Sequence, residues 1–176
     1  MAYDQQKYDH AKATPAPKPK KAKKPRPKAV VMCNGGCTEA GLCKSGCIGC
    51  GSCTTACRRG AIAITPEGFA HVDPELCIGC GLCMRVCPQN VIAMVEPRFN
   101  ITARCSNTEP GSVAKKVCAT SCVSCRACEK ACPAGAIKVI DNHAVINWNL
   151  CIACGMCATK CPRGVIRDAF GILAEK

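Results

Sequence analysis

The chain has 176 residues, among which 21 are cysteine, 24 are Lys or Arg, 12 are Asp or Glu, and only 3% are aromatic. Hydrophobic residues make up 48% of the chain, but this figure includes cysteine, so ordinary apolar side chains are scarce. A chain this small therefore needs metal or disulfides to stabilise its core. No stretch approaches the roughly 18 apolar residues of a membrane span, and residues 1–28 contain no apolar signal-peptide core. The composition therefore predicts a cytoplasmic protein whose cysteines bind metal rather than form disulfides.

Positive charge is concentrated at the N-terminus. Residues 1–30 hold nine Lys or Arg against Asp4 and Asp9, so they carry +7 of the net charge of +12. Five prolines within residues 11–28 exclude a continuous helix and predict an extended basic arm. A flexible solubilising tail and an arm that lies along an acidic surface of a partner protein both fit this composition. Nucleic-acid binding is not expected, because no basic patch with stacking aromatic residues accompanies the arm.

Sixteen of the cysteines form four runs with the spacing Cys-x2-Cys-x2-Cys-x3-Cys. Bacterial ferredoxins hold [4Fe–4S] clusters with this spacing, and in two-cluster ferredoxins the fourth cysteine of each run binds the cluster of the other run. The spacing therefore predicts four clusters with crossed ligands. The four ligand sets are Cys47, Cys50, Cys53 and Cys87; Cys77, Cys80, Cys83 and Cys57; Cys122, Cys125, Cys128 and Cys161; and Cys151, Cys154, Cys157 and Cys132.

Zinc is the alternative metal, since paired Cys-x2-Cys motifs also build zinc sites. Those motifs use two pairs of cysteines with a longer gap between the pairs, whereas here three cysteines follow one another at two-residue gaps. A zinc-bound interaction module is therefore the less favoured hypothesis. Such a protein would lack the brown colour of iron–sulfur clusters and would contain no sulfide.

Hydrophobic patterning predicts the same short elements twice. In the first half we expect a strand at 29–32, a hairpin at 61–72 that turns at 66–68, and a closing strand at 92–95. The second half aligns with the first and places its hairpin turn at 141–143. The prediction is an α+β fold with a basic arm at 1–28, two tandem bacterial-ferredoxin-like 2[4Fe–4S] modules at 29–98 and 99–170, a linker at 96–100 between them, and a tail at 171–176.

Five cysteines lie outside the runs: Cys33, Cys37, Cys43, Cys105 and Cys118. In the alignment of the two halves Cys33 matches Cys105, and Cys43 matches Cys118. A metal site common to both modules would thus have two cysteines, which is too few for a closed thiolate site. We expect these cysteines to pack as small buried apolar side chains near the clusters. A fifth cluster on Cys33, Cys37 and Cys43 with an outside ligand is the minor alternative.

Several segments resemble the B subunit of Rnf-type ferredoxin:NAD oxidoreductase complexes over about residues 29–168. They are A-V-V-M-C-N-G-G-C at 29–37, R-C-S-N at 104–107, and the cysteine runs themselves. The resemblance implies an electron-relay subunit that exchanges electrons with soluble ferredoxin and with a flavin or iron–sulfur partner. Members of that family begin with a membrane-anchoring helix and a further four-cysteine module, where this chain has the basic arm. Membrane attachment and ion pumping are therefore not expected here.

The sequence contains no paired carboxylates, nucleophile and base pair, or phosphate-binding loop, so we assign no catalytic residue and do not expect the chain to be an enzyme by itself. The predicted function is one-electron transfer through four [4Fe–4S] clusters. We expect the chain to be a subunit of a cytoplasmic redox complex that also contains a flavoprotein, a hydrogenase or a dehydrogenase. A free-standing polyferredoxin, which would purify alone, is the alternative.

Overall fold

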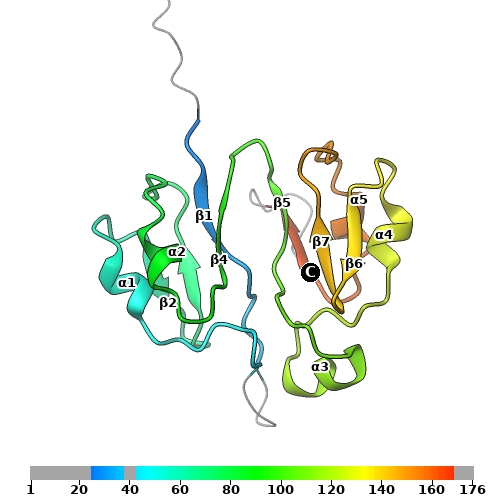
Figure 1. Ribbon diagram of the computed structural model, residues 1–176, viewed down its shortest axis with the longest axis horizontal. Helices are drawn as coiled ribbons and strands as arrows, with labels where there is room; N and C mark the ends of the chain where they lie inside the picture. The colour runs from blue at the N-terminus through cyan, green and yellow to red at the C-terminus, as the bar shows by residue number, and fades with distance from the viewer. Residues whose placement is uncertain (1–24, 38–42, 169–176) are drawn as a thin grey trace, which may run out of the picture.

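The computed structural model describes residues 25–37 and 43–168, and its elements repeat in the order strand, helix, strand, strand, helix, strand (Figure 1). The predictions for residues 1–24 of the basic arm and for the tail at 171–176 lie outside the described residues. The mixture of helices and strands expected from the sequence is present in both halves.

The first half contains two antiparallel strand pairs and two short helices. Its elements are β1 (Lys28–Val31), α1 (Ser52–Ala56), β2 (Ile62–Ile64), β3 (Ala70–Val72), α2 (Leu82–Val86) and β4 (Ile92–Val95). β1 pairs with β4, and β2 pairs with β3. The predicted first strand, hairpin and closing strand are thus confirmed, with the first strand beginning one residue earlier than expected.

The second half repeats this arrangement and adds one helix. Its elements are β5 (Ile101–Ala103), α3 (Gly111–Val117), α4 (Ala127–Ala131), β6 (Ile137–Ile140), β7 (His143–Ile146), α5 (Met156–Thr159) and β8 (Ile166–Asp168). β5 pairs with β8, and β6 pairs with β7. The hairpin turns at Asp141 and Asn142, which have φ of 44° and 63°, a backbone that Asp and Asn tolerate. The prediction that His143 belongs to the turn was wrong, because a two-residue turn lets His143 pair with Ile140.

The first and last strands of each half pair with each other and close the unit. Lys28 lies opposite Val95 in the first half, and Ile101 lies opposite Asp168 in the second. All five described helices are short, with four to seven residues. Within residues 25–37 and 43–168 no helix has both the length and the apolar character that crossing a bilayer requires.

Each half has its own small core in which cysteines lie among aliphatic side chains. In the second half Ile101, Ile137 and Ile166 are each 1% exposed and pack with cysteines of the third and fourth runs. In the first half Val31 and Ile62 pack with cysteines of the first and second runs. The core is therefore built from the same residues that are the candidate metal ligands.

The two halves lie side by side, with β1 and β4 of the first and β5 of the second next to the junction (Figure 1). The backbone N–H of Ala119 donates to the carbonyl of Gly36 over 2.6 Å, and the hydroxyl of Thr120 donates to the carbonyl of Gly35 over 2.6 Å. Cys37 and Cys118 also form an isolated antiparallel bridge. Hydrogen bonds therefore join the loop after β1 to the segment before the third cysteine run.

The burial of β6 gives a direct test of the second core. Ile137 and Ile140 are on the same strand and are 1% and 50% exposed, respectively. We expect Ile137→Ala to lower the free energy of unfolding by about 2–5 kcal/mol, because it leaves a cavity, and Ile140→Ala to lower it by less than about 1 kcal/mol. The measurement is anaerobic guanidinium unfolding followed by circular dichroism. Equal losses for the two variants would contradict the packing described.

Candidate metal centres

The four cysteine runs share one backbone turn. In each run two residues have positive φ, namely the second residue after the first cysteine and the residue after the second cysteine: Gly49, Gly51, Gly79, Gly81, Ser124, Arg126, Ala153 and Gly155. Left-handed backbone costs a non-glycine residue about 1–2 kcal/mol, yet Ser124, Arg126 and Ala153 adopt it at 55–57°. Such strain persists only where the surrounding structure holds it. The surrounding structure therefore imposes this turn, because residues other than glycine adopt it as well.

A short helix follows each of these turns and carries the third cysteine of the run. α1 begins directly after Gly51, and α2 begins directly after Gly81. In the second half α4 begins after Arg126 and α5 begins after Gly155. The third cysteine is buried in all four helices, so each helix brings one sulfur into the core.

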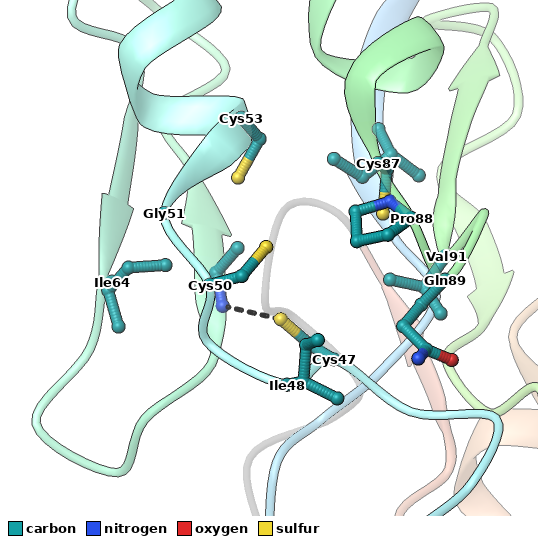
Figure 2. Close-up of a pocket in the computed structure, with 12 residues that line it drawn as sticks. Cys47, Ile48, Cys50, Gly51, Cys53, Ile64, Cys87, Pro88, Gln89 and Val91 are labelled. Carbon is teal, nitrogen blue, oxygen red and sulfur yellow. Dashed lines mark hydrogen bonds between the residues drawn. The ribbon is translucent and has the colours of Figure 1, made fainter.

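The first predicted ligand set converges on one cavity. Cys47, Cys50 and Cys53 line it together with Cys87, which comes from the second run. Figure 2 shows the four sulfur atoms around the same space, and the dashed line marks the Ala70 N–H that donates to Cys47 Sγ over 3.3 Å. The crossed grouping that the spacing predicts is the grouping that the fold brings together here.

The third predicted set has the equivalent arrangement in the second half. Cys122, Cys125, Cys128 and Cys161 line one cavity. The pKa of Cys128 is raised to about 11, chiefly by burial and in part by the neighbouring Cys122 and Cys161, because three thiolates would repel one another. A bound cation would reverse this penalty, because metal ligation favours the deprotonated thiolate.

The second set also comes together, because Cys57 lines a cavity with Cys77, Cys80 and Cys83 of the second run. In the fourth set Cys157 lies near Cys132 and Cys151, and its pKa is raised to about 11, chiefly by burial and in part by these two neighbours. The fourth member of that set, Cys154, follows Cys151 by three residues and is exposed.

The donor sets consist of cysteine sulfur alone, which both zinc and iron–sulfur clusters take as ligands. Within the described part of the chain, which includes all 21 cysteines, no group of three or more His, Cys, Asp or Glu side chains is arranged to hold one ion. The feature that favours [4Fe–4S] clusters over zinc is the spacing of the runs, in which three cysteines follow one another at two-residue gaps.

Backbone N–H groups point at several of the sulfurs. The fourth cysteine of three runs accepts a hydrogen bond from the residue four positions later, as in Ala61 to Cys57 at 3.4 Å, Ala136 to Cys132 at 3.2 Å and Val165 to Cys161 at 3.3 Å. These donors stabilise negative charge on sulfur, and hydrogen bonds of this kind help to set the potentials of iron–sulfur clusters.

The second cysteine of every run lies at the surface. Cys50, Cys80, Cys125 and Cys154 are the exposed cysteines of the chain. In three of the runs the residue after the first cysteine is an exposed isoleucine, with exposed fractions of 43% for Ile48, 45% for Ile78 and 66% for Ile152. Each candidate centre thus has a buried sulfur on the helix and an exposed sulfur at the surface. In three of the runs an exposed apolar side chain lies near that surface sulfur in the sequence.

The five remaining cysteines were expected to pack as small apolar side chains near the clusters. Cys43 and Cys118 are buried, and Cys33 and Cys105 pack against the two cores. The structure also brings all five, Cys33, Cys37, Cys43, Cys105 and Cys118, to one cavity at the junction. The alignment of Cys33 with Cys105 and of Cys43 with Cys118 was the feature of the sequence that pointed to this grouping. The sequence analysis did not predict the grouping, because it considered each pair of cysteines within its own module.

Comparison with known proteins identifies the kind of domain that the chain contains. Three family models, each described as a 4Fe-4S dicluster domain, match residues 40–94, 76–136 and 121–166. No curated protein matches the chain. A chain of the formate dehydrogenase – heterodisulfide reductase – formylmethanofuran dehydrogenase complex from Methanospirillum hungatei is 18% identical with a TM-score of 0.28, and the match covers 69% of this chain. This chain spans 51% of the length of that solved chain.

Two glycines of the second run provide a matched test of the turn geometry. Gly79 and Gly81 have φ of 73° and 74°, so alanine is strained equally at both, by about 1–2 kcal/mol. A Cβ at Gly79 would collide with the carbonyl oxygen of Pro27, whereas one at Gly81 would meet no atom within 4 Å. We expect Gly79→Ala to be less stable than Gly81→Ala by a further 1–3 kcal/mol or so in anaerobic thermal unfolding. Identical melting temperatures would show that Pro27 does not lie against this turn.

Proposed function

We propose that this chain, which contains tandem 4Fe–4S dicluster ferredoxin domains, relays single electrons through four [4Fe–4S] clusters held by the four crossed cysteine sets. The observation that carries the proposal is the convergence of sulfurs from two distant runs on one cavity, as Cys87 joins Cys47, Cys50 and Cys53. Each bound cluster would supply a centre that accepts and releases one electron. The residues described above would bind, shield and tune those centres.

The crossed ligands would also stabilise the fold. Cys57 follows α1 yet lies with the second run, and Cys87 follows α2 yet lies with the first run. Ligation at either cavity would therefore fasten α1 to α2, which already contact each other. Because ligands dispersed in the unfolded chain become ordered only around the metal, binding would contribute directly to folding.

Apolar side chains shield the centres from water. Ile64, Val91 and Ile92 line the first cavity, and Val139, Val165 and Ile166 line its counterpart in the second half. Such a shell lowers the local dielectric, which acts against the addition of negative charge to a reduced cluster, while the backbone N–H donors act in the opposite direction. The balance of the two effects is the means by which the chain would set each potential.

Electrons would enter and leave at the exposed cysteines. Exposed Cys50 and Cys80 in the first half, and Cys125 and Cys154 in the second, bring ligand sulfur to the surface at opposite parts of the chain. The isoleucines beside three of these cysteines offer apolar contact to a partner. A relay needs such contacts at both ends, which supports a role between two proteins rather than storage within one.

We further propose that the chain works as a subunit of a larger oxidoreductase and is similar in role to the Rnf B subunit. The resemblance at 29–37 and 104–107 supports this assignment, and the basic residues at 1–28 give a segment that an acidic partner surface would attract. Soluble ferredoxin and a flavoprotein, hydrogenase or dehydrogenase are the expected partners. A free polyferredoxin carrier is the alternative, since it would need the same cluster sites.

The crossed ligands can be tested by single substitutions. We expect Cys87→Ser to change the EPR signal and midpoint potential of the same cluster as Cys50→Ser, because both sulfurs line one cavity. Cys80→Ser is the matched control and should change a different cluster, together with Cys57→Ser. Potentiometric EPR of the anaerobically purified variants provides the measurement. If Cys87→Ser instead reproduced the spectrum of Cys80→Ser, each run would bind its own cluster and the crossed assignment would be wrong.

The subunit assignment can be tested by isolation. We expect the tagged full chain, purified anaerobically from its native cells, to bring down a flavoprotein, hydrogenase or dehydrogenase in fixed stoichiometry. High salt should weaken the complex if the basic arm contributes to docking. Mass spectrometry of the eluted proteins identifies the partner. Recovery of the brown chain alone, in high yield and at low salt, would favour the free carrier.

A further inference from the structure

The cavity at the junction resembles the two predicted cluster cavities in the kind of residue that lines it, because several cysteines line each of the three. Cys33, Cys37 and Cys43 reach it from the first half, and Cys105 and Cys118 reach it from the second. No ligand of the four crossed sets lines it.

Four of these cysteines form two equivalent pairs. Cys33 and Cys105 each lie two residues after the first strand of their half. Cys43 and Cys118 each lie four residues before the first cysteine of a run. One pair alone is too small for a closed thiolate site, but the junction places the two pairs around one space and supplies four sulfurs.

The sulfurs of these pairs lie close to one another. A Cβ built on Gly46 would be 3.5 Å from Cys43 Sγ and 3.6 Å from Cys33 Sγ. The thiol of Cys118 donates to the carbonyl of Gly35 over 3.3 Å, which brings Cys118 to the loop that holds Cys33. All four cysteines line the same cavity, as the members of a common ligand set must.

We propose that Cys33, Cys43, Cys105 and Cys118 bind a fifth [4Fe–4S] cluster between the two modules. Four cysteine thiolates are the usual ligand set of a [4Fe–4S] cluster, which is the group proposed for the four crossed sets. The fifth cysteine, Cys37, has no counterpart in the second half and is assigned no ligand role.

Hydrogen bonds to sulfur support this choice of ligands. The N–H of Gly35 donates to Cys33 Sγ over 3.4 Å, and the N–H of Cys122 donates to Cys105 Sγ over 3.3 Å. The same type of bond reaches the predicted ligands of the crossed sets, for example Cys132 and Cys161. Backbone donors are thus already aimed at two of the four sulfurs, where they would stabilise thiolate charge.

Two unpaired donors at the cavity indicate a negatively charged occupant. Arg104 Nε and Asn107 Nδ2 are both buried without a hydrogen-bond partner, and both residues line the cavity. The Arg104 guanidinium also brings a positive charge to the lining of the cavity. An anionic cluster with four thiolates would compensate that charge and accept hydrogen bonds from both donors.

The site would connect the two modules electrically. Cys122 begins the third run and donates its N–H to Cys105, and the backbone of Cys47, which begins the first run, faces Cys33 in the same way. The proposed cluster would therefore lie between the centres of the first and third ligand sets. This relay role rests on the proposed function, whereas the binding of a fifth cluster does not.

Iron and sulfide analysis tests the proposal without any substitution. We expect the full chain, purified anaerobically and freed of loosely bound iron, to contain about 20 iron atoms and about 20 sulfides, since five cubanes have four of each. Cys33→Ser/Cys105→Ser should lose about four of each. Cys37→Ser, a cysteine in the same cavity, is the matched control and should retain the full content. EPR of the reduced variants should show the crossed-set clusters intact and thereby report folding.

Each result supports or overturns a separate part of the proposal. About 16 iron atoms in the unmodified chain would exclude the fifth cluster and leave the four crossed clusters in place. A colourless chain would overturn both. Equal iron in the double variant and the unmodified chain would remove Cys33 and Cys105 from the ligand set. A loss of about four iron atoms from Cys37→Ser, with the other clusters intact, would overturn the symmetric ligand assignment.

Discussion

The structure depends on the convergence of cysteine sulfurs from separate segments on shared cavities. The strands have only three or four residues and the helices four to seven, so neither has the length to be stable by itself. Cysteines of all four runs are part of the apolar cores, and the aliphatic residues beside them are few. Metal ligation is therefore the interaction most able to hold these short elements together.

Because the two halves repeat one structural unit, the junction between them can form a site that neither half forms alone. Each half presents a cysteine after its first strand and another before its first run, and Cys33 with Cys43 has the same place as Cys105 with Cys118. Two half-sites become useful only when they face each other. The hydrogen bonds from Ala119 and from other residues of the second half to the loop after β1 bring the half-sites into that position.

The sequence predicted strands and turns well where the residue types allow few backbone conformations. The alternation at 61–72 with a Pro-Glu-Gly turn requires a hairpin, and β2 and β3 form it. The second hairpin was placed correctly, but His143 was assigned to the turn, because patterning alone cannot distinguish a two-residue turn from a three-residue turn. The left-handed backbone of Ser124 and Ala153 had no signal in their residue types.

The sequence by itself determined the chemistry, since Cys-x2-Cys-x2-Cys-x3-Cys is a local pattern whose residue types and spacing limit what can bind. It also predicted which cysteines should cross between runs, and in three of the four sets the predicted cysteines line a common cavity. Only the tertiary structure decided what the other five cysteines face. Their grouping depends on how two modules dock, and docking is governed by contacts between residues far apart in the chain, such as Gly35 with Thr120, which no local pattern records.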